Sequence, residues 1–451
     1  MSREPTAIER CHVATCDPAG TEYADGHVVL DGSRIVAVGP GRAPDAYRGG
    51  ELIDGSGCLV TPGLVNTHHH LYQWITRGIA QDTTLFGWLT TLYPIWARID
   101  ADTVHSSAAA NLGWMALTGC TTTSDHHYVF PVDGGDCLEA EITAAQRIGL
   151  RFHPARGSMD LGQSSGGLPP DSVVEQRDAI LAATEAAIDR WHDASTDSML
   201  RIVVAPCSPF TVTDGLMREA AELARRKGVR MHTHLAETAD EEDFCQARHG
   251  CSPAEYAENL GWLGDDVWMA HCVYLSDAAV GAFAATGTGV AHCPTSNGRL
   301  GSGAAPITAL LAAGAPVGLG VDGAASNESG RMIDELHQAL LVARVRGGPL
   351  ALSARQALGM ATIGGARCLG RQDELGSLEP GKLADIALWR VDGIAGSGVA
   401  DPVCTLVFGA PTLDRLVVGG RTIVEHGHLT TADEEELAGA AAKASAALRA
   451  G

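Results

Sequence analysis

Short apolar runs, each followed by a longer segment in which apolar residues recur at helical spacing, fill the centre of the chain. Eight such runs occur, and eight strand-and-helix units are the number that a closed (β/α)8 barrel of the TIM type requires. The sequence therefore predicts an α/β fold. The predicted strands cover residues 59–67, 121–126, 150–157, 201–207, 229–235, 267–272, 289–293 and 317–322, and two of the predicted helices cover residues 171–191 and 214–227.

Both ends of the chain have a different pattern, in which apolar and polar residues alternate over short distances. Near the start, Asp31-Gly32 separates two such runs, which predicts a β-hairpin. The same alternation returns over residues 383–389 and 414–424. We therefore expect a small β-sandwich domain formed by both chain termini, from residues 1–61 and 376–451, around a barrel of residues 62–375. A surface helix is expected from Thr431.

Composition and charge restrict the partners of the protein. The chain has 451 residues and a formal net charge of -22, which would repel nucleic-acid phosphates and anionic membranes. No apolar run approaches the ~18 residues of a membrane-spanning helix. The twelve cysteines form no CxxC pair and no secretory signal precedes them, so we expect reduced thiols and a cytoplasmic location. A small-molecule substrate is expected, and a homo-oligomer is left open.

Polar and titratable residues gather at the ends of the predicted strands, where a parallel barrel places its chemistry. Each histidine alone could be a packed core residue. Several such groups meeting at one rim need a metal ion or a partner, because burial of each without one costs several kcal/mol. The residues are His68, His70, Asp125, His126, His127, Arg156, His232, His234, Glu237, His271, His292 and Asp322.

The types and spacing of these residues suit a metal centre. Since side chains alternate along a strand, His68 and His70 share one face and His69 points to the other. Zinc favours neutral imidazoles and a carboxylate, with one position left for water. His68, His70, a histidine from the fifth strand (His232 or His234) and Asp322 supply that set. Glu237 is close enough to move protons, and His271 could stabilise an oxyanion or orient water.

Five ordered motifs carry a resemblance to a known family. They are residues 62–70 (PGLVNTHHH), 234–238 (HLAET), 270–272 (AHC), 292–297 (HCPTSN) and 320–323 (GVDG). The chain resembles the amidohydrolase superfamily, in the branch of aminohydrolases that deaminate purines, pterins and related heterocycles. The similarity extends over nearly the whole chain, because residues 375–385 resemble the return of the family into its small β-domain.

Within that branch, residues 85–98, 156–159 and 166–171 resemble the 8-oxoguanine deaminases. Triazine and isocytosine aminohydrolases look similar in these segments. Leu85, Leu89, Leu92 and Trp96 also form a helical stripe, which indicates packing over the barrel mouth.

The resemblance implies that His68, His70, His234 and Asp322 bind one divalent ion, with zinc expected. It selects His234 over His232, which then becomes a packed interior residue, as we also expect of His69 and His127. Asp322 would accept the proton of the attacking water. Glu237 would protonate the ring nitrogen and help deliver a proton to departing ammonia, and His271 would hold the attacking oxygen or the developing charge.

Three residues are candidates for substrate binding. Arg156 could pair with a ring carbonyl through its planar guanidinium, Gln73 could reach a ring edge, and Trp96 could stack on the ring. Structural alternatives stand beside each role, since Arg156 could support a loop, Gln73 could cap a helix, and Trp96 could belong to the core.

The resemblance implies hydrolytic deamination of 8-oxoguanine to urate and ammonia. Sister activities on isocytosine, a hydroxytriazine, a pterin or S-adenosylhomocysteine are alternatives, and a non-catalytic scaffold is an alternative of another class. Cyclic-amide hydrolysis is a further one, but that branch commonly bridges two metals with a modified lysine at the fourth strand end. Residues 205–208 (APCS) contain no lysine, which favours a single metal.

Overall fold

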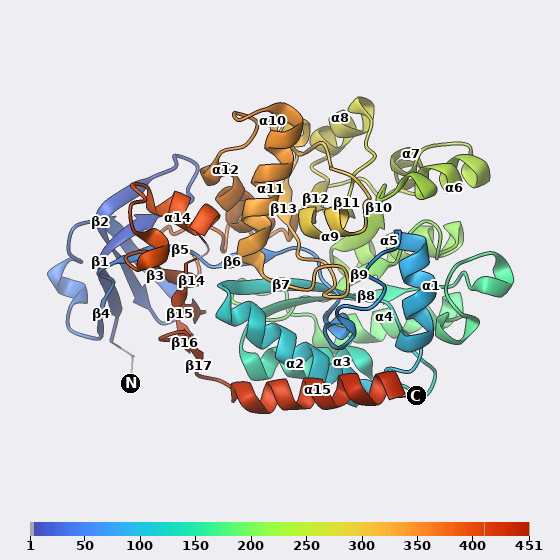
Figure 1. Cartoon of the computed structure of the whole chain (residues 1–451), viewed down its shortest axis with the longest axis horizontal. Coiled ribbons are helices and arrows are strands. Elements are labelled where there is room, and N and C mark those ends of the chain that lie inside the picture. The colour runs from blue at the N-terminus through green and yellow to red at the C-terminus, as the bar shows by residue number, and fades with distance from the viewer. Residues whose placement is uncertain (1–3, 410, 451) are drawn as a thin grey trace.

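Eight parallel strands close into a barrel at the centre of the molecule, as the sequence predicts (Figure 1). The structure is a computed structural model that describes residues 4–409 and 411–450. The barrel order is β10-β11-β12-β13-β6-β7-β8-β9, so the first and last barrel strands in the sequence are neighbours. The strands are β6 (Leu64–Asn66), β7 (Cys120–His127), β8 (Arg151–Ser158), β9 (Val203–Pro206), β10 (Met231–Leu235), β11 (Val267–His271), β12 (Gly289–His292) and β13 (Val317–Leu319).

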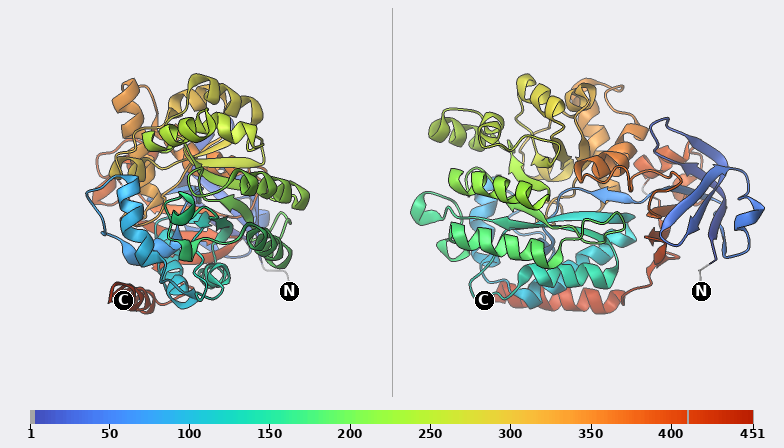
Figure 2. Two further views of the ribbon diagram at one scale, coloured as in Figure 1. Left: turned by 90° about the vertical axis from the view of Figure 1, so that its right-hand side faces the viewer. Right: turned by 180° about the vertical axis from the view of Figure 1, so that it is seen from behind.

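Helices surround the barrel and bury their apolar faces against the outer side of its strands (Figure 2). The helix α5 (Asp214–Lys227) is typical, because the Thr213 hydroxyl caps its first turn and Gly228 ends it in a left-handed conformation. The predicted helix over residues 171–191 is shorter, since a single 3-10 turn η4 (Asp171–Val173) precedes α4 (Arg177–Trp191).

The remaining helices follow the strands in sequence order. Within the described residues, no helix is both long and apolar enough to cross a membrane. The helices are α1 (Leu85–Trp96), α2 (Ala101–Leu117), α3 (Cys137–Ile148), α6 (Ala239–His249), α7 (Pro253–Asn259), α8 (Asp277–Thr286), α9 (Pro294–Arg299), α10 (Ile307–Ala313), α11 (Met332–Gly347), α12 (Ala354–Gly359), α13 (Gly365–Cys368), α14 (Pro402–Gly409) and α15 (Glu434–Ala450), with shorter turns η1 (Asp45–Tyr47), η2 (Leu71–Thr76), η3 (Gln163–Ser165), η5 (Met360–Gly364) and η6 (Ile394–Gly396).

Both ends of the chain form a second sheet beside the barrel (Figure 1). Its nine strands form one continuous sheet, and apolar residues from its early and late strands share one cluster. The predicted hairpin is present as β2 and β3, with Gly32 in the turn at φ +58°. The strands are β1 (Thr6–Ala14), β2 (Glu22–Asp31), β3 (Arg34–Pro40), β4 (Leu52–Asp54), β5 (Cys58–Pro62), β14 (Ile386–Arg390), β15 (Leu413–Val418), β16 (Arg421–Glu425) and β17 (His428–Leu429).

One predicted strand, residues 59–67, is divided between the two sheets. The first part is β5, which pairs with β14, and the second is β6, which enters the barrel beside β7. The change occurs at Gly63, whose N–H donates to the carbonyl of Asp385, while the next N–H donates to Gly119. A Cβ at Gly63 would lie 2.1 Å from the side chain of Thr121, so only glycine fits the crossing. The apolar run therefore serves both sheets.

The helix α15, expected from the sequence, runs along the outside of α2 (Figure 1). Its far end reaches η2, the turn that follows the histidine triplet. There the Ser445 hydroxyl donates to the carbonyl of Ile75 at 2.6 Å. The last described helix thus contacts the segment that leads from the barrel mouth.

Candidate active site

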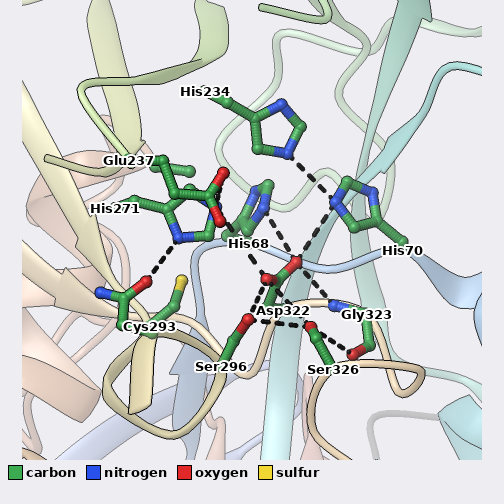
Figure 3. Close-up of polar contacts among 12 residues, drawn as sticks. His68, His70, His234, Glu237, His271, Cys293, Ser296, Asp322, Gly323 and Ser326 are labelled. Carbon is green, nitrogen blue, oxygen red and sulfur yellow. Dashed lines mark hydrogen bonds and ion pairs between the residues drawn. The ribbon is translucent and has the colours of Figure 1, made fainter. Parts of the chain in front are cut away.

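The predicted histidines and acids meet at the carboxyl ends of the barrel strands (Figure 3). The side chains of His68, His70 and His234 point toward Asp322, and Glu237 lies beside His271. The Nε2 atoms of His68 and His70 lie 3.3 and 3.2 Å from Oδ1 of Asp322. All of these side chains are at least nine-tenths buried.

A hydrogen bond fixes the tautomer of each of the three histidines. His70 Nδ1 lies 2.7 Å from the carbonyl of His126, and His234 Nδ1 lies 2.7 Å from the carbonyl of Cys207. Because a carbonyl only accepts, each Nδ1 carries the proton and each Nε2 keeps a free lone pair.

His68 reaches the same state through a second histidine. Its Nδ1 lies 2.7 Å from Nε2 of His232, whose own Nδ1 lies 2.9 Å from the carbonyl of Trp268. His232 must donate to that carbonyl, so its Nε2 accepts the proton of His68 Nδ1. The Nε2 of His68 is left buried without a hydrogen-bond partner among the described residues.

Three lone pairs and a carboxylate therefore face one another over short distances. The Nε2 atoms of His70 and His234 are 3.1 Å apart, although neither can donate to the other. Burial lowers the pKa of His68 and of His234 well below the usual value, so both imidazoles are neutral. The lone pairs and the carboxylate repel one another when no ion lies between them, and all of them attract a cation. Imidazole nitrogens and a carboxylate oxygen are ligands that zinc prefers. The residues present fit a divalent metal ion.

The backbone holds Asp322 in an unusual conformation. Its φ is +61°, in the left-handed region that non-glycine residues seldom adopt, and such strain is common at functional positions. Oδ1 accepts the N–H of Gly323 at 2.7 Å and Oδ2 accepts the Ser296 hydroxyl at 2.6 Å. Both of these donors favour the charged form of the carboxyl group. Asp322 is therefore an anion aimed at the histidines.

Glu237 and His271 form the other side of the site. Glu237 Oε2 lies 3.6 Å from His271 Nε2, whose Nδ1 is 2.9 Å from Oδ1 of Asn297. Burial, and next the charge of Asp322, raises the pKa of Glu237 well above its usual value. Glu237 can thus hold a proton near neutral pH, as a general acid requires.

The backbone of Glu237 is fixed by a second buried acid. Glu241 accepts the N–H of Ala236 at 2.7 Å and the N–H of Glu237 at 3.0 Å. Two bonds from one carboxyl group set the direction of the turn after β10, and so the direction of the Glu237 side chain.

A pocket opens over these groups, between α1 and the strand ends. Its free space is about 30 Å³, room for about one or two water molecules. Aromatic and apolar side chains form the wall, as is usual where a planar ligand binds. The lining residues are His70, Leu85, Trp88, Leu89, Tyr93, Tyr128, Cys207, Ser208, Phe210, His234, Glu237, His271, Leu300 and Asp322.

Several wall residues received no role from the sequence. Tyr128 directly follows His127 at the end of β7, and Cys207 follows the end of β9, so their places at strand ends were a usable signal. Phe210 lies on a loop, and no pattern in the sequence points to it. The expected stripe of α1 is confirmed as packing, since Leu85, Leu89, Leu92 and Trp96 are all buried.

Comparison with known proteins agrees with this geometry. Residues 59–423 match the model of the amidohydrolase family. The chain belongs to this family. The predicted resemblance is therefore confirmed, and the match begins in β5 and ends in β16.

Similar proteins in the family act on heterocycles or carry zinc. The chain is 44% identical to an 8-oxoguanine deaminase of Pseudomonas aeruginosa, over 96% of each chain. It is 38% identical to an isoxanthopterin deaminase of an unknown prokaryotic organism, over 94% of this chain and 92% of that one. The crystal structure of an atrazine chlorohydrolase from Arthrobacter aurescens TC1, complexed with zinc, matches with a TM-score of 0.93 and 35% identity, covering 98% of this chain and 100% of that one.

In the structure of this chain, Arg156 lies away from the active-site pocket. Its neighbour Ala155 faces the barrel interior, so Arg156 faces the surrounding layer. Both guanidinium ends contact the carboxylate of Glu175, at 2.7 and 2.9 Å, and the group lies over the ring of Phe130. The alternative of a loop-supporting arginine fits this position, and we no longer assign Arg156 to substrate binding.

Trp96 and Gln73 are also not among the residues that line the pocket. Trp96 is fully buried, with Nε1 donating to the Thr76 hydroxyl at 3.2 Å, and its place is that of a core residue. Gln73 is buried against Gly323, where a Cβ would come within 1.8 Å of Oε1. That oxygen has no hydrogen-bond partner among the described residues. Gln73 thus touches the loop of Asp322 and is not part of the pocket lining given above.

The remaining histidines of the triplet region pack as expected. His69 accepts the N–H of His70 and lies 2.9 Å from Nδ2 of Asn111, so it points away from the metal site. His127 lies 2.8 Å from the carboxylate of Glu141 on α3. His126 stacks on His234, and its Nε2 lies 2.9 Å from the carbonyl of Ala205. His126 therefore packs against His234 and is anchored to the backbone of β9.

Proposed function

We propose that the protein is a metal-dependent aminohydrolase that converts 8-oxoguanine and water to urate and ammonia. The observation that supports it most is the meeting of three Nε2 lone pairs with the Asp322 carboxylate beneath a pocket with aromatic and apolar side chains in its wall. The choice of 8-oxoguanine rests on the 44% identity with the 8-oxoguanine deaminase over 96% of each chain.

In this proposal His68, His70, His234 and Asp322 hold one divalent ion, expected to be zinc. When bound, such an ion supplies a hydroxide nucleophile near neutral pH. The absence of a lysine at the end of β9, where Cys207 and Ser208 stand, favours one ion over two.

The residues of this chain would then divide the proton transfers. Asp322 accepts the proton that the attacking water loses. His271, held through Asn297, orients the attacking oxygen at the ring carbon that carries the exocyclic amine. Glu237 gives its proton to the adjacent ring nitrogen, then takes the proton of the added hydroxyl as the carbonyl forms and passes it to the departing amine, which leaves as ammonia. The proton held by Asp322 finally returns to Glu237. One water is consumed and one C–N bond is broken.

We also propose that this chemistry takes place in the cytoplasm on a free base. All twelve cysteines are free thiols, and nine of them are buried, which suits a reducing compartment. The net charge of -22 disfavours a base within a nucleic acid.

The test is ammonia release by the zinc-loaded protein from a panel of free heterocycles. The panel contains 8-oxoguanine, guanine, isocytosine, a hydroxytriazine, isoxanthopterin and S-adenosylhomocysteine. We expect kcat/KM for 8-oxoguanine to exceed every other value by about tenfold or more, a transition-state difference of ~1.4 kcal/mol. A higher value for another compound would move the assignment to that sister activity. Failure of zinc to produce any activity would favour a non-catalytic scaffold.

A second measurement tests the metal itself. Metal analysis of the purified protein should give one ion per chain, and Asp322→Asn should lower that content. Two ions per chain would contradict the single-metal centre.

A further inference from the structure

A second cavity lies at the opposite end of the barrel from the active site. It lies at the amino ends of β8, β9 and β10. Arg201 stands two residues before β9, and Arg230 directly precedes β10. The volume of the cavity is about 240 Å³. The lining residues are His153, His192, Ala194, Arg201, Ile202, Val203, Gly228, Val229, Arg230 and Gly370.

Positive charge is concentrated at this cavity in a chain whose net charge is -22. Arg371 lies just behind it, with Nη1 3.5 Å from Nε2 of His153. Arg201 and Arg371 share the single carboxylate of Glu374, at 2.8 and 2.6 Å. With Arg230, three guanidinium groups lie in or just behind the wall of the cavity. The carboxylate of Glu374 pairs with two of them, Arg201 and Arg371.

Arg230 is bound mainly through uncharged groups. Its Nη2 donates to the carbonyl of Cys368 at 2.9 Å, and its guanidinium is 5.9 Å from the ring of Trp268. The nearby carboxylate of Asp266 is already paired with Arg225 at 2.9 Å. A Cβ at position 370 would lie 2.6 Å from Nη1 of Arg230, so Gly370 leaves the space that this guanidinium occupies.

Two guanidinium donors at the cavity have no acceptor. Nε of Arg201 and Nε of Arg230 are buried, and neither finds a hydrogen-bond partner in the part of the chain that the structure describes. Leaving a buried charged donor unpaired costs more than leaving a neutral one, so the charges of these two guanidinium groups are incompletely compensated.

The pKa values of two neighbouring groups show the influence of these guanidinium charges. Burial, and next the charges of Arg371 and Arg201, lowers the pKa of His153 well below its usual value. Burial, and next the charge of Arg201, lowers the pKa of Arg371 to about 10. An anion in the cavity would reverse the effect of the like charges.

We propose that this cavity binds a phosphate group, held by the guanidinium groups of Arg201 and Arg230, which line it. A tetrahedral dianion offers acceptors in several directions and matches the local excess of positive charge, whereas a planar monoanion would satisfy less of it. The proposal is independent of the reaction at the other end of the barrel.

The test compares thermal unfolding of the zinc-loaded protein in sodium phosphate and in sodium chloride of equal ionic strength. We expect ~20 mM phosphate to raise the Tm by about 2 °C or more, as a ligand bound only by the folded state does. Arg230→Leu should abolish this rise. Arg226→Leu is the matched control, since Arg226 is exposed on α5 just before the cavity, and it should keep the rise.

If Arg230→Leu folds poorly, titration calorimetry of a second variant measures the affinity for phosphate directly. Arg201→Gln removes the other guanidinium group, and we expect it to weaken phosphate binding by tenfold or more. Equal affinity in Arg201→Gln and the wild type overturns the proposal. So does a wild-type protein whose Tm in phosphate equals that in chloride.

The source of the phosphate is separated by a parallel titration with ribose 5-phosphate, which carries no base for the active-site pocket. Tighter binding than inorganic phosphate assigns the cavity to a phosphate ester, and weaker binding assigns it to the free ion. In either case the site is supported if Arg201→Gln weakens binding of the tighter-binding compound. The site is overturned if Arg201→Gln leaves that binding unchanged.

Discussion

His68 Nδ1 lies 2.7 Å from His232 Nε2, and this contact makes the tautomer of a metal-site histidine depend on a residue in the barrel interior. The ring of His232 is itself stacked on Trp268, with centroids 4.6 Å apart. His232 is thus a positioning residue for His68, although it faces no substrate.

His232→Phe should keep the ring packing but remove the acceptor for His68 Nδ1. We expect zinc affinity to fall by about 10- to 100-fold, the usual cost of losing such a supporting bond. Competition with a chelator measures it. The control is His426→Phe, at an exposed position on the terminal sheet, and zinc affinity equal to the wild type in His232→Phe would contradict the role.

Glu237→Gln should retain zinc and lose turnover. The amide keeps the shape of the side chain but cannot give up a proton, so kcat for ammonia release should fall by ~10²- to 10⁴-fold. Metal analysis and kinetics on the same preparation check both halves. Asp243→Asn, on the exposed side of α6, is the control. Activity within twofold of the wild type in Glu237→Gln would exclude the proton-transfer role.

Stability should fall as the pH rises, in part because of Glu335 on α11. This buried acid accepts the N–H of Thr295 and the amide of Asn327, and burial raises its pKa from 4.5 to about 8. The folded state keeps a proton that the unfolded state releases, so the contribution is complete below pH 4.5 and is lost as the pH rises through about 8.

Glu335→Gln should therefore make Tm fall less steeply between pH 5 and pH 8. Over this range the wild type loses the stabilisation that comes from the proton on Glu335. Scanning calorimetry at several pH values measures the slope. Glu258→Gln, at an exposed position, should leave the slope unchanged. An identical slope in Glu335→Gln would show that this carboxyl group does not hold the proton.

We expect helix α1 to move when a purine-sized base enters, because the free space of the pocket is about 30 Å³. Trp88 holds the helix in place through a hydrogen bond from Nε1 to the carbonyl of Ala325, at 3.2 Å. Trp88→Phe should speed hydrogen exchange across residues 85–96 several-fold, and a bound substrate analogue should slow it again. Trp114→Phe is matched, since Trp114 donates to the carbonyl of Ser329 outside the pocket. Unchanged exchange in Trp88→Phe would indicate that other contacts close the helix.

The sequence predicted the barrel because its strands are buried on both faces and form continuous apolar runs. The same property concealed the division at Gly63, since β5 and β6 are also both buried and nothing in the apolar pattern marks a change of sheet. Only the hydrogen-bond partners on either side of Gly63 reveal it.

The candidate site was predictable where residue type limits the chemistry, as for the histidines and Asp322. Arg156 was misplaced because the strand continues to Ser158, so that its alternation carries the guanidinium to the outer layer. The wall residue Phe210 could not be predicted, because the path of a loop depends on contacts that are distant in the sequence.

The pairing of β5 with β14 and the contact of Ser445 with Ile75 have a consequence for biosynthesis. A ribosome that has delivered all eight barrel strands has not yet delivered β14 or α15, which support the segments on either side of the histidine triplet. Contacts between such distant residues form late. Zinc acquisition should therefore follow translation of these last elements, and a nascent chain stalled after β13 should bind the metal poorly.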